Sequence, residues 1–189
     1  ANLDGKEGVN NGSNTLEDHG DLTIIGNNTP RYNFGLTLTG AWKGFDFSVF
    51  LQGVMKRDYW LDGPYFWGAN GGLWQSTAFK EHMDYWRPEG DPLGANTNAY
   101  YPKPYFNTDK NQKVQSGYLQ NAAYCRLKNA QIGYTLPKIW TRKAAMESVR
   151  VYVSGDNLVT FSGISGVFDP ELLGSDWGDG KLYPLQRTI

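Results

Sequence analysis

The sequence has very few of the side chains on which disulfides, metal sites and common catalytic centres depend. Its 189 residues include one cysteine, Cys125, and two histidines, His19 and His82. A single cysteine excludes an intrachain disulfide framework and a cysteine-based zinc site. The chain has no HExxH, GxSxG or phosphate-binding-loop motif, and no spacing fixes the carboxylate pair that a glycosidase needs. We therefore expect no enzyme activity, no metal and no cofactor.

Long apolar runs and a strong charge of one sign are also missing. No stretch reaches the roughly 18 apolar residues of a transmembrane helix. Residues 1–21 are rich in Asn, Gly and Asp and lack the apolar core of a signal peptide, so we expect the chain to be a piece of a longer protein. A formal net charge of −1 gives no electrostatic reason to expect a nucleic-acid partner.

Glycine and aromatic residues are abundant instead, with 23 Gly, 12 Tyr, 9 Phe and 7 Trp. This composition is typical of strands, turns and exposed loops. In residues 31–41 and 45–55, which are separated only by Trp42-Lys43-Gly44, apolar and polar side chains alternate. Alternate side chains of a strand lie on opposite faces, so each stretch has one apolar and one polar side.

Two architectures explain this alternation. At about 3.3 Å per residue, roughly eleven tilted residues cross the hydrocarbon core of a bilayer. The pair therefore fits a hairpin of a transmembrane β-barrel, whose lipid face is apolar and whose interior is polar. A soluble β-sandwich gives the same alternation with the apolar face turned inward, and it is the commoner architecture. A secreted carbohydrate-binding sandwich with exposed Trp and Tyr is accordingly the alternative interpretation.

Strand character returns in residues 118–136 and 149–161. In the first of these the alternation changes phase, because Cys125 and Leu127 are apolar while Arg126 and Lys128 are charged. A bulge near Lys128, or departure from the membrane zone, would explain the change.

The connections between these strands alternate in length. Residues 42–44 and 137–148 are the shorter connections, and residues 57–117 and 162–181 are the long ones. In bacterial barrels the short turns lie on the periplasmic side and the long loops lie outside. We therefore expect 57–117 and 162–181 to be extracellular, with the last strand, which starts in 182–189, running toward the periplasm. A sandwich has no reason to follow this alternation.

Several strings are specific enough to indicate a family. They are 24–27 (IIGN), 29–32 (TPRY), 42–46 (WKGFD), 85–89 (YWRPE), 118–129 (YLQNAAYCRLKN), 131–137 (QIGYTLP), 151–158 (VYVSGDNL) and 168–171 (FDPE). In these strings and their order the sequence resembles the late barrel of SusC/RagA-type TonB-dependent receptors of Bacteroidota. The resemblance covers most residues from 21 to 189.

The resemblance implies an all-β fold in which antiparallel strands form the C-terminal part of a large transmembrane β-barrel with long extracellular loops. Residues 1–189 would be the C-terminal segment of the barrel domain in the bacterial outer membrane, with no plug domain in this chain. An open sheet would leave unpaired edges in hydrocarbon, so we expect the remainder of the barrel to be required. The expected divisions are 1–30 (extracellular loop and a strand start at 22–25), 31–56 (hairpin), 57–117 (long extracellular loop), 118–161 (strand pair), 162–181 (extracellular loop) and 182–189 (start of the last strand).

The function that the resemblance implies is active import of large nutrients across the outer membrane. The nutrient is expected to be a glycan oligosaccharide, with a peptide as the other possibility. The implied partners are a SusD-like surface lipoprotein, the TonB complex through the missing N-terminal part, the transported molecule and membrane lipid.

Candidate functional residues follow from the loops and from the two strand faces. An aromatic ring can pack on the apolar face of a pyranose, but it can equally pack a loop against itself or lie at the membrane boundary. The candidates for contact with substrate or lid are Trp60, Trp67, Trp74, Tyr85, Trp86, Asp169 and Glu171. The candidates for the lumen face are Asp46, Gln52 and Lys56. Those for the lipid face are Phe34, Leu36, Leu38, Phe47, Val49, Leu51, Ile132, Tyr134, Val151 and Val153.

Overall fold

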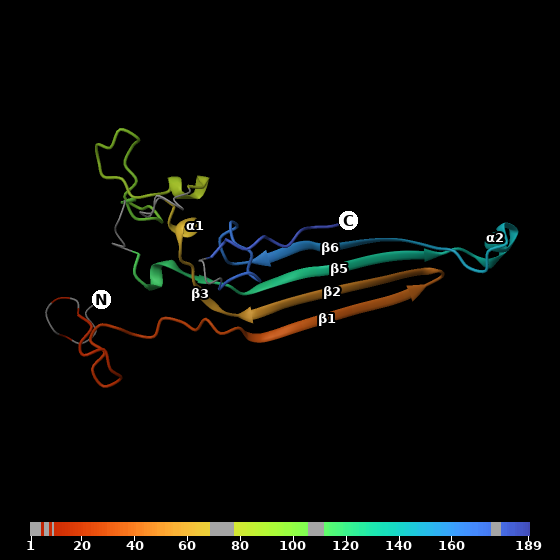
Figure 1. Ribbon diagram of the computed structural model, residues 1–189, viewed down its shortest axis with the longest axis horizontal. Helices are drawn as coiled ribbons and strands as arrows, with labels where there is room; N and C mark the ends of the chain where they lie inside the picture. The colour runs from red at the N-terminus through yellow and green to blue at the C-terminus, as the bar shows by residue number, and fades with distance from the viewer. Residues whose placement is uncertain (1–4, 6–7, 9, 69–77, 106–111, 175–178) are drawn as a thin grey trace.

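An open antiparallel sheet of four long strands is the main element of the computed structural model (Figure 1). The structure describes residues 5, 8, 10–68, 78–105, 112–174 and 179–189. The strands lie in the order β1–β2–β5–β6, and each pairs antiparallel with its neighbour. Their bounds are Arg31–Trp42 for β1, Phe45–Lys56 for β2, Tyr124–Thr135 for β5 and Arg150–Ser162 for β6. The predicted all-β, antiparallel class is confirmed.

The strand register gives the sheet one apolar and one polar face. Leu38 lies opposite Val49, and Phe47 lies opposite Ile132, which in turn lies opposite Val153. Directly paired residues share a face, and by this rule all ten residues predicted to face lipid lie on the same side. In this chain the apolar face is uncovered, since Leu36, Phe47 and Val153 are 47%, 48% and 61% exposed.

A bulge lies where the sequence changes phase. The pairing of β5 with both neighbours skips Lys128, because Leu127 lies opposite Leu51 and Val159 whereas Asn129 lies opposite Phe50 and Asp156. One extra residue in a strand restores the alternation of side chains on its far side. The predicted bulge near Lys128 is therefore confirmed, and Arg126 shares the polar face with its partners Gln52 and Thr160.

The shorter elements lie at the two ends of the sheet. At one end, β3 (Asp58–Trp60) pairs antiparallel with β4 (Leu119–Asn121), close to α1 (Pro64–Trp67). The short helices η1 (Lys80–Met83) and η2 (Ser116–Tyr118) belong to the same long connection. At the opposite end, α2 (Lys138–Thr141) and η3 (Arg142–Ala144) join β5 to β6 (Figure 1). No helix in the described part of the chain is long and apolar enough to cross a membrane.

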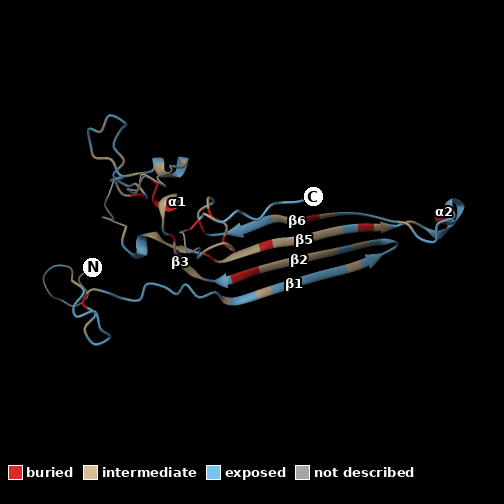
Figure 2. Cartoon of the chain, in the orientation of Figure 1, coloured by how far each residue is buried: buried red, intermediate tan, exposed pale blue. Residues whose placement is uncertain are grey.

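The hydrophobic core lies beyond the sheet, among the connections at the β3–β4 end. Figure 2 shows that the long strands are mostly half-buried or exposed, while the connections carry many of the buried residues. Partly buried rings from Trp60 and Tyr118 pack against this cluster. Its buried members are Leu61, Phe66, Trp67, Tyr101, Ala122, Ile164 and Phe168. The connection after β2 and the connection after β6 therefore share one core.

The structure differs from the sequence prediction at residues 22–25, which form no strand. The segment that follows is held by β3 instead of by a strand of the large sheet. Asp58 N–H donates to Asn27 O at 3.0 Å, and Asn27 N–H donates to Asp58 Oδ2 at 3.1 Å. Turn-forming residues and Pro30 favour this irregular path over an extended ladder. Near the other terminus, Thr188 forms a single antiparallel bridge with Asp156 of β6.

Candidate functional site

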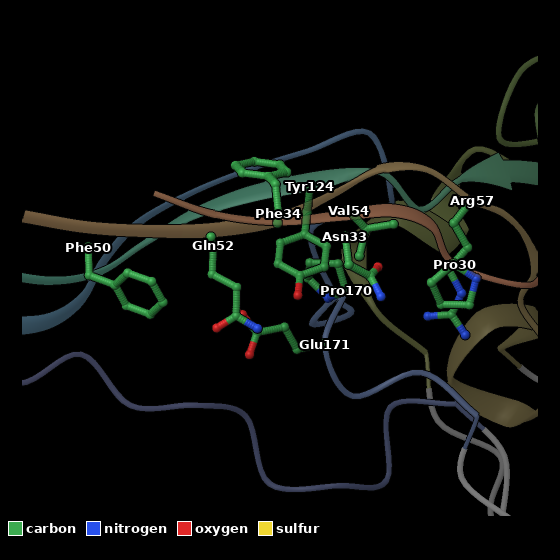
Figure 3. Close-up of a pocket in the computed structure, with 12 residues that line it drawn as sticks. Pro30, Asn33, Phe34, Phe50, Gln52, Val54, Arg57, Tyr124, Pro170 and Glu171 are labelled. Carbon is green, nitrogen blue, oxygen red and sulfur yellow. The ribbon is translucent and has the colours of Figure 1, made fainter. Parts of the chain in front are cut away.

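A groove on the polar face of the sheet lies at the end nearest the shared core. Its volume is about 730 Å³, and residues from β1, β2, β5 and the connection after β6 line it. Figure 3 shows Gln52, Tyr124 and Glu171 on one side of the ribbons and Phe34 projecting to the opposite side. The residues that give the groove its chemistry are Asn33, Phe50, Gln52, Tyr124, Pro170 and Glu171.

A buried ion-pair network meets this groove at Glu171. Arg126 on β5 lies with Nη2 2.7 Å from Asp169 Oδ1 and Nη1 3.3 Å from Glu171 Oε1. Its Nε donates to Thr160 Oγ1 on β6 at 2.8 Å. The Arg126 side chain is only 4% exposed. A guanidinium removed from water at this depth requires such carboxylate partners to offset its lost hydration.

A second cation completes the network. Lys128 Nζ lies 2.8 Å from Glu171 Oε2. Within the loop, Glu171 N–H donates to Asp169 Oδ1 at 3.0 Å. Two cations of β5 therefore hold the Asp169-Pro170-Glu171 turn against the polar face.

Asp169 and Glu171, expected from the sequence to contact substrate or lid, both lie against cations in the structure. Their partners Arg126 and Lys128 were not among the predicted site residues. The sequence does show two cations two residues apart, in a strand whose apolar and polar side chains otherwise alternate. It gives no indication that they pair with carboxylates 43 residues further along the chain.

The three residues predicted to face the lumen share the polar face of β2 but differ in their partners. Asp46 pairs with Arg150 of β6. Gln52 lines the groove. Lys56 is exposed at the end of β2, opposite Arg31. That the three residues face the lumen stays a prediction.

Two candidate tryptophans pack in the shared core. The rings of Trp60 and Trp67 lie 5.9 Å apart between centroids. Trp67 is only 6% exposed, and its Nε1 donates to Asp62 Oδ1 at 3.2 Å. This geometry favours a packing role for Trp67. Trp74 lies outside the described residues.

Tyr85 and Trp86 lie on a short ribbon in the same connection. Tyr85 forms an isolated parallel β-bridge with Tyr101, and Trp86 N–H donates to Tyr101 O at 2.9 Å. The guanidinium of Arg87 lies 4.8 Å from the centre of the Tyr85 ring. Tyr85 packs against the core, whereas Trp86 keeps an exposed ring. Of the candidate rings in the described residues, Trp86 is therefore the best placed for an external contact.

The connections also contain a buried carboxylate, Asp179. Its oxygens accept hydrogen bonds from Tyr59 O–H, Asp62 N–H and Gly174 N–H at 3.0 to 3.1 Å. Burial, reinforced by the charge of Asp179, raises the pKa of Tyr59 to about 12. Burial likewise raises the pKa of Tyr101 to about 12. Both tyrosines are therefore neutral at physiological pH.

Comparison with known proteins gives matches to receptors and transporters. The chain is 31% identical over 182 residues to the TonB-dependent receptor P3 of Formosa agariphila, covering 89% of this chain and 16% of that protein. It is 28% identical over 184 residues to the TonB-dependent receptor P26 of the same organism, covering 89% and 17%. This chain therefore spans about a sixth of the length of these relatives. No family model matches.

Solved structures of transporters also match this chain. The RagAB peptide transporter matches with a TM-score of 0.58 and 25% identity over 82% of this chain and 16% of that one. The RagAB peptide importer in its open-open state matches with a TM-score of 0.52 and 27% identity over 80% of this chain and 15% of the other.

Proposed function

The chain is a segment of a SusC/RagA-type TonB-dependent receptor of the bacterial outer membrane, and we propose that the whole receptor imports a large oligomeric nutrient through its barrel. In this proposal the four long strands form part of the barrel wall. Their apolar face contacts lipid, and their polar face, with the groove and the ion-pair network, contacts the lumen.

The observation that carries the proposal is the division of the sheet into an apolar face and a face that holds its charged residues. The apolar face, which includes Leu36 and Phe47, is exposed along the strands, while the charged network around Arg126 lies on the other face. A soluble carbohydrate-binding sandwich would turn its apolar face inward against a second sheet. The exposed apolar face therefore favours the barrel over the sandwich.

The orientation follows from the lengths of the connections. We propose that the turn at 42–44 and the connection at 137–148 are periplasmic, and that 57–117 and 162–181 are extracellular. The shared core supports this arrangement, because it joins the two long connections at one end of the sheet. A SusD-like surface lipoprotein would then contact the exposed surface of these connections, and TonB would act through a part of the receptor outside this chain.

For the substrate we propose a glycan oligosaccharide. Rings with exposed surface in the long connection, such as those of Trp86 and Tyr100, suit the apolar faces of sugars. A peptide is the second candidate, because the solved relatives are described as a peptide transporter and a peptide importer.

An uptake experiment tests the function. Cells that carry or lack the full-length receptor are given fluorescent oligosaccharides or fluorescent peptides, with a protonophore as the control for energy coupling. We expect receptor-dependent, protonophore-sensitive uptake of an oligosaccharide. Uptake of peptides alone would replace the glycan assignment with the second candidate. Equal accumulation of every probe with and without the receptor would refute import.

A further inference from the structure

A second cleft lies within the connections and shares no lining residue with the groove on the sheet. It has a volume of about 640 Å³ and is bordered by residues 81–101, by β4 and by residues 163–166. The residues that decide its chemistry are Glu81, Asp84, Tyr100, Gln120, Asn121 and Ser165.

The Tyr100 ring is a fixed aromatic surface in this cleft. It packs at 86° against the Tyr101 ring at 4.9 Å and at 86° against the Tyr118 ring at 5.5 Å between centroids. Its exposure is nevertheless 40%. Two neighbouring rings thus restrain the Tyr100 side chain while part of its surface stays open to a ligand. Because the side chain is already ordered, a ligand that binds to it costs less conformational entropy.

Hydrogen-bond donors and acceptors surround the Tyr100 ring. Asp84 accepts from Tyr100 N–H at 3.1 Å and from Asn96 Nδ2 at 2.9 Å. The hydrogen bond from Asn96, then that from the Tyr100 backbone, lowers the pKa of Asp84, so its carboxylate stays ionised at neutral pH. Glu81 Oε2 lies 3.4 Å from Ser165 Oγ.

The Gln120 amide joins the two sides of the cleft. Its Oε1 accepts from Ser165 N–H at 2.9 Å, and its Nε2 donates to the Tyr100 hydroxyl at 3.3 Å. The Tyr100 hydroxyl, the amides and the carboxylates together offer both donors and acceptors. A hydroxyl-rich ligand needs both.

We propose that this cleft is a subsite for a neutral sugar residue of an oligosaccharide. A pyranose presents an apolar C–H face to Tyr100 and hydroxyls to Glu81, Asp84 and Gln120. Among the described residues, two carboxylates and no lysine or arginine line the cleft, so anionic sugars are disfavoured. The proposal rests on the glycan import proposed above.

A binding experiment on the full-length receptor in detergent tests the subsite. The probes are maltoheptaose, laminariheptaose and xylohexaose as neutral oligosaccharides, oligogalacturonate as an anionic one and tetralysine as a cationic peptide. Isothermal titration calorimetry gives the dissociation constants. We expect a neutral oligosaccharide to bind and oligogalacturonate to bind at least about tenfold more weakly.

Two variants change the cleft in different ways. Gly166→Phe places a large ring at a residue that lines the cleft, and it fits without backbone strain, because an added Cβ meets no atom within 4 Å and the backbone has no positive φ. Tyr100→Ala removes the ring. Each should weaken the neutral oligosaccharide by about tenfold or more. Tyr105→Ala, at a tyrosine that lies in the same connection outside the cleft and is 49% exposed, should leave binding unchanged.

The outcomes separate the subsite from the proposed function. Unchanged affinity in both Gly166→Phe and Tyr100→Ala would overturn the subsite while receptor-dependent uptake still supports import. Binding of tetralysine alone, lost in Glu81→Gln and kept in Glu89→Gln, would overturn the sugar assignment and identify a site for cationic peptides. Binding of none of the neutral probes would also overturn it.

Discussion

Arg150 on β6 reaches across β5 to Asp46 on β2, with Arg150 Nε donating to Asp46 Oδ1 at 3.0 Å. The residue between them on β5 is Gly133, which lies directly opposite Asp46. A Cβ at Gly133 would lie 2.6 Å from Arg150 Nη2 and 2.8 Å from Asp46 Oδ1. The ion pair thus occupies the space of the missing side chain, and it joins three strands through one contact.

Replacing Gly133 should therefore weaken this contact. Gly133→Ala is expected to lower the free energy of unfolding only slightly, because the ion pair that it disrupts is exposed to solvent. Urea unfolding of the full-length receptor in micelles measures the change. In Asp46→Ala the same glycine substitution should add little, because the two residues act through one interaction. Additive losses would mean that the alanine acts elsewhere.

Removing Arg126 should have a larger effect. Arg126→Leu leaves the carboxylates of Asp169 and Glu171 with Lys128 as their nearest cation, and breaking a buried pair in this way costs about 3–5 kcal/mol. Limited proteolysis of the full-length receptor should show faster cleavage in the connection after β6.

Lys128→Gln is the matched control, because the Lys128 side chain is 23% exposed and, in the described part of the chain, its ion pair is with Glu171. Lys128→Gln should accelerate cleavage of the connection after β6 much less than Arg126→Leu does. Equal protection of the connection in Arg126→Leu and the unaltered receptor would show that the network does not hold the Asp169–Glu171 turn.

A charge on the apolar face should block assembly. Leu36→Arg or Val49→Arg is expected to cost about 2–4 kcal/mol if the residue lies near the bilayer midplane. The heat-modifiable band of the folded receptor in outer-membrane fractions reports assembly. Thr37→Arg places the same charge on the opposite face of the same strand and should be tolerated. Normal insertion of the Leu36 and Val49 variants would count against contact with lipid.

The shared core should weaken at alkaline pH. The folded-state pKa of Tyr59 is raised from 10.0 to about 12. The neutral form is therefore favoured in the folded state, and its contribution is complete below pH 10 and lost as the pH rises toward 12. Tryptophan fluorescence against pH follows this loss, because Trp60 and Trp67 lie in this core. The change in fluorescence at alkaline pH should be smaller in Tyr59→Phe. It should be unaltered in Tyr183→Phe, because Tyr183 is exposed.

Much of the sheet could be predicted because its signal is local. In a strand every second side chain lies on the same face, so the positions of Leu36, Leu38 and Val49 in the sequence predict which side chains share a face. The bulge at Lys128 was visible for the same reason, since one extra residue reverses that period.

The site was harder to predict because its contacts join distant segments. Arg126 and Asp169 meet only after β6 and its connection return to β5. Trp67 lies in an irregular connection without a period, so its sequence position did not distinguish a buried ring from an exposed one. The cleft around Tyr100 depends on Gln120 and Ser165 in the same way.

The placement of the core beyond the strands has a consequence for how such receptors diversify. A mutation inside a conventional sandwich disturbs packing beneath the whole sheet, whereas here the buried core residues belong to the connections at one end of the sheet. Surface residues such as Trp86 and Glu81 can therefore be exchanged without altering the barrel wall, provided that Phe66, Leu61 and their neighbours keep their volume. Recognition can evolve on a scaffold that is separately stabilised.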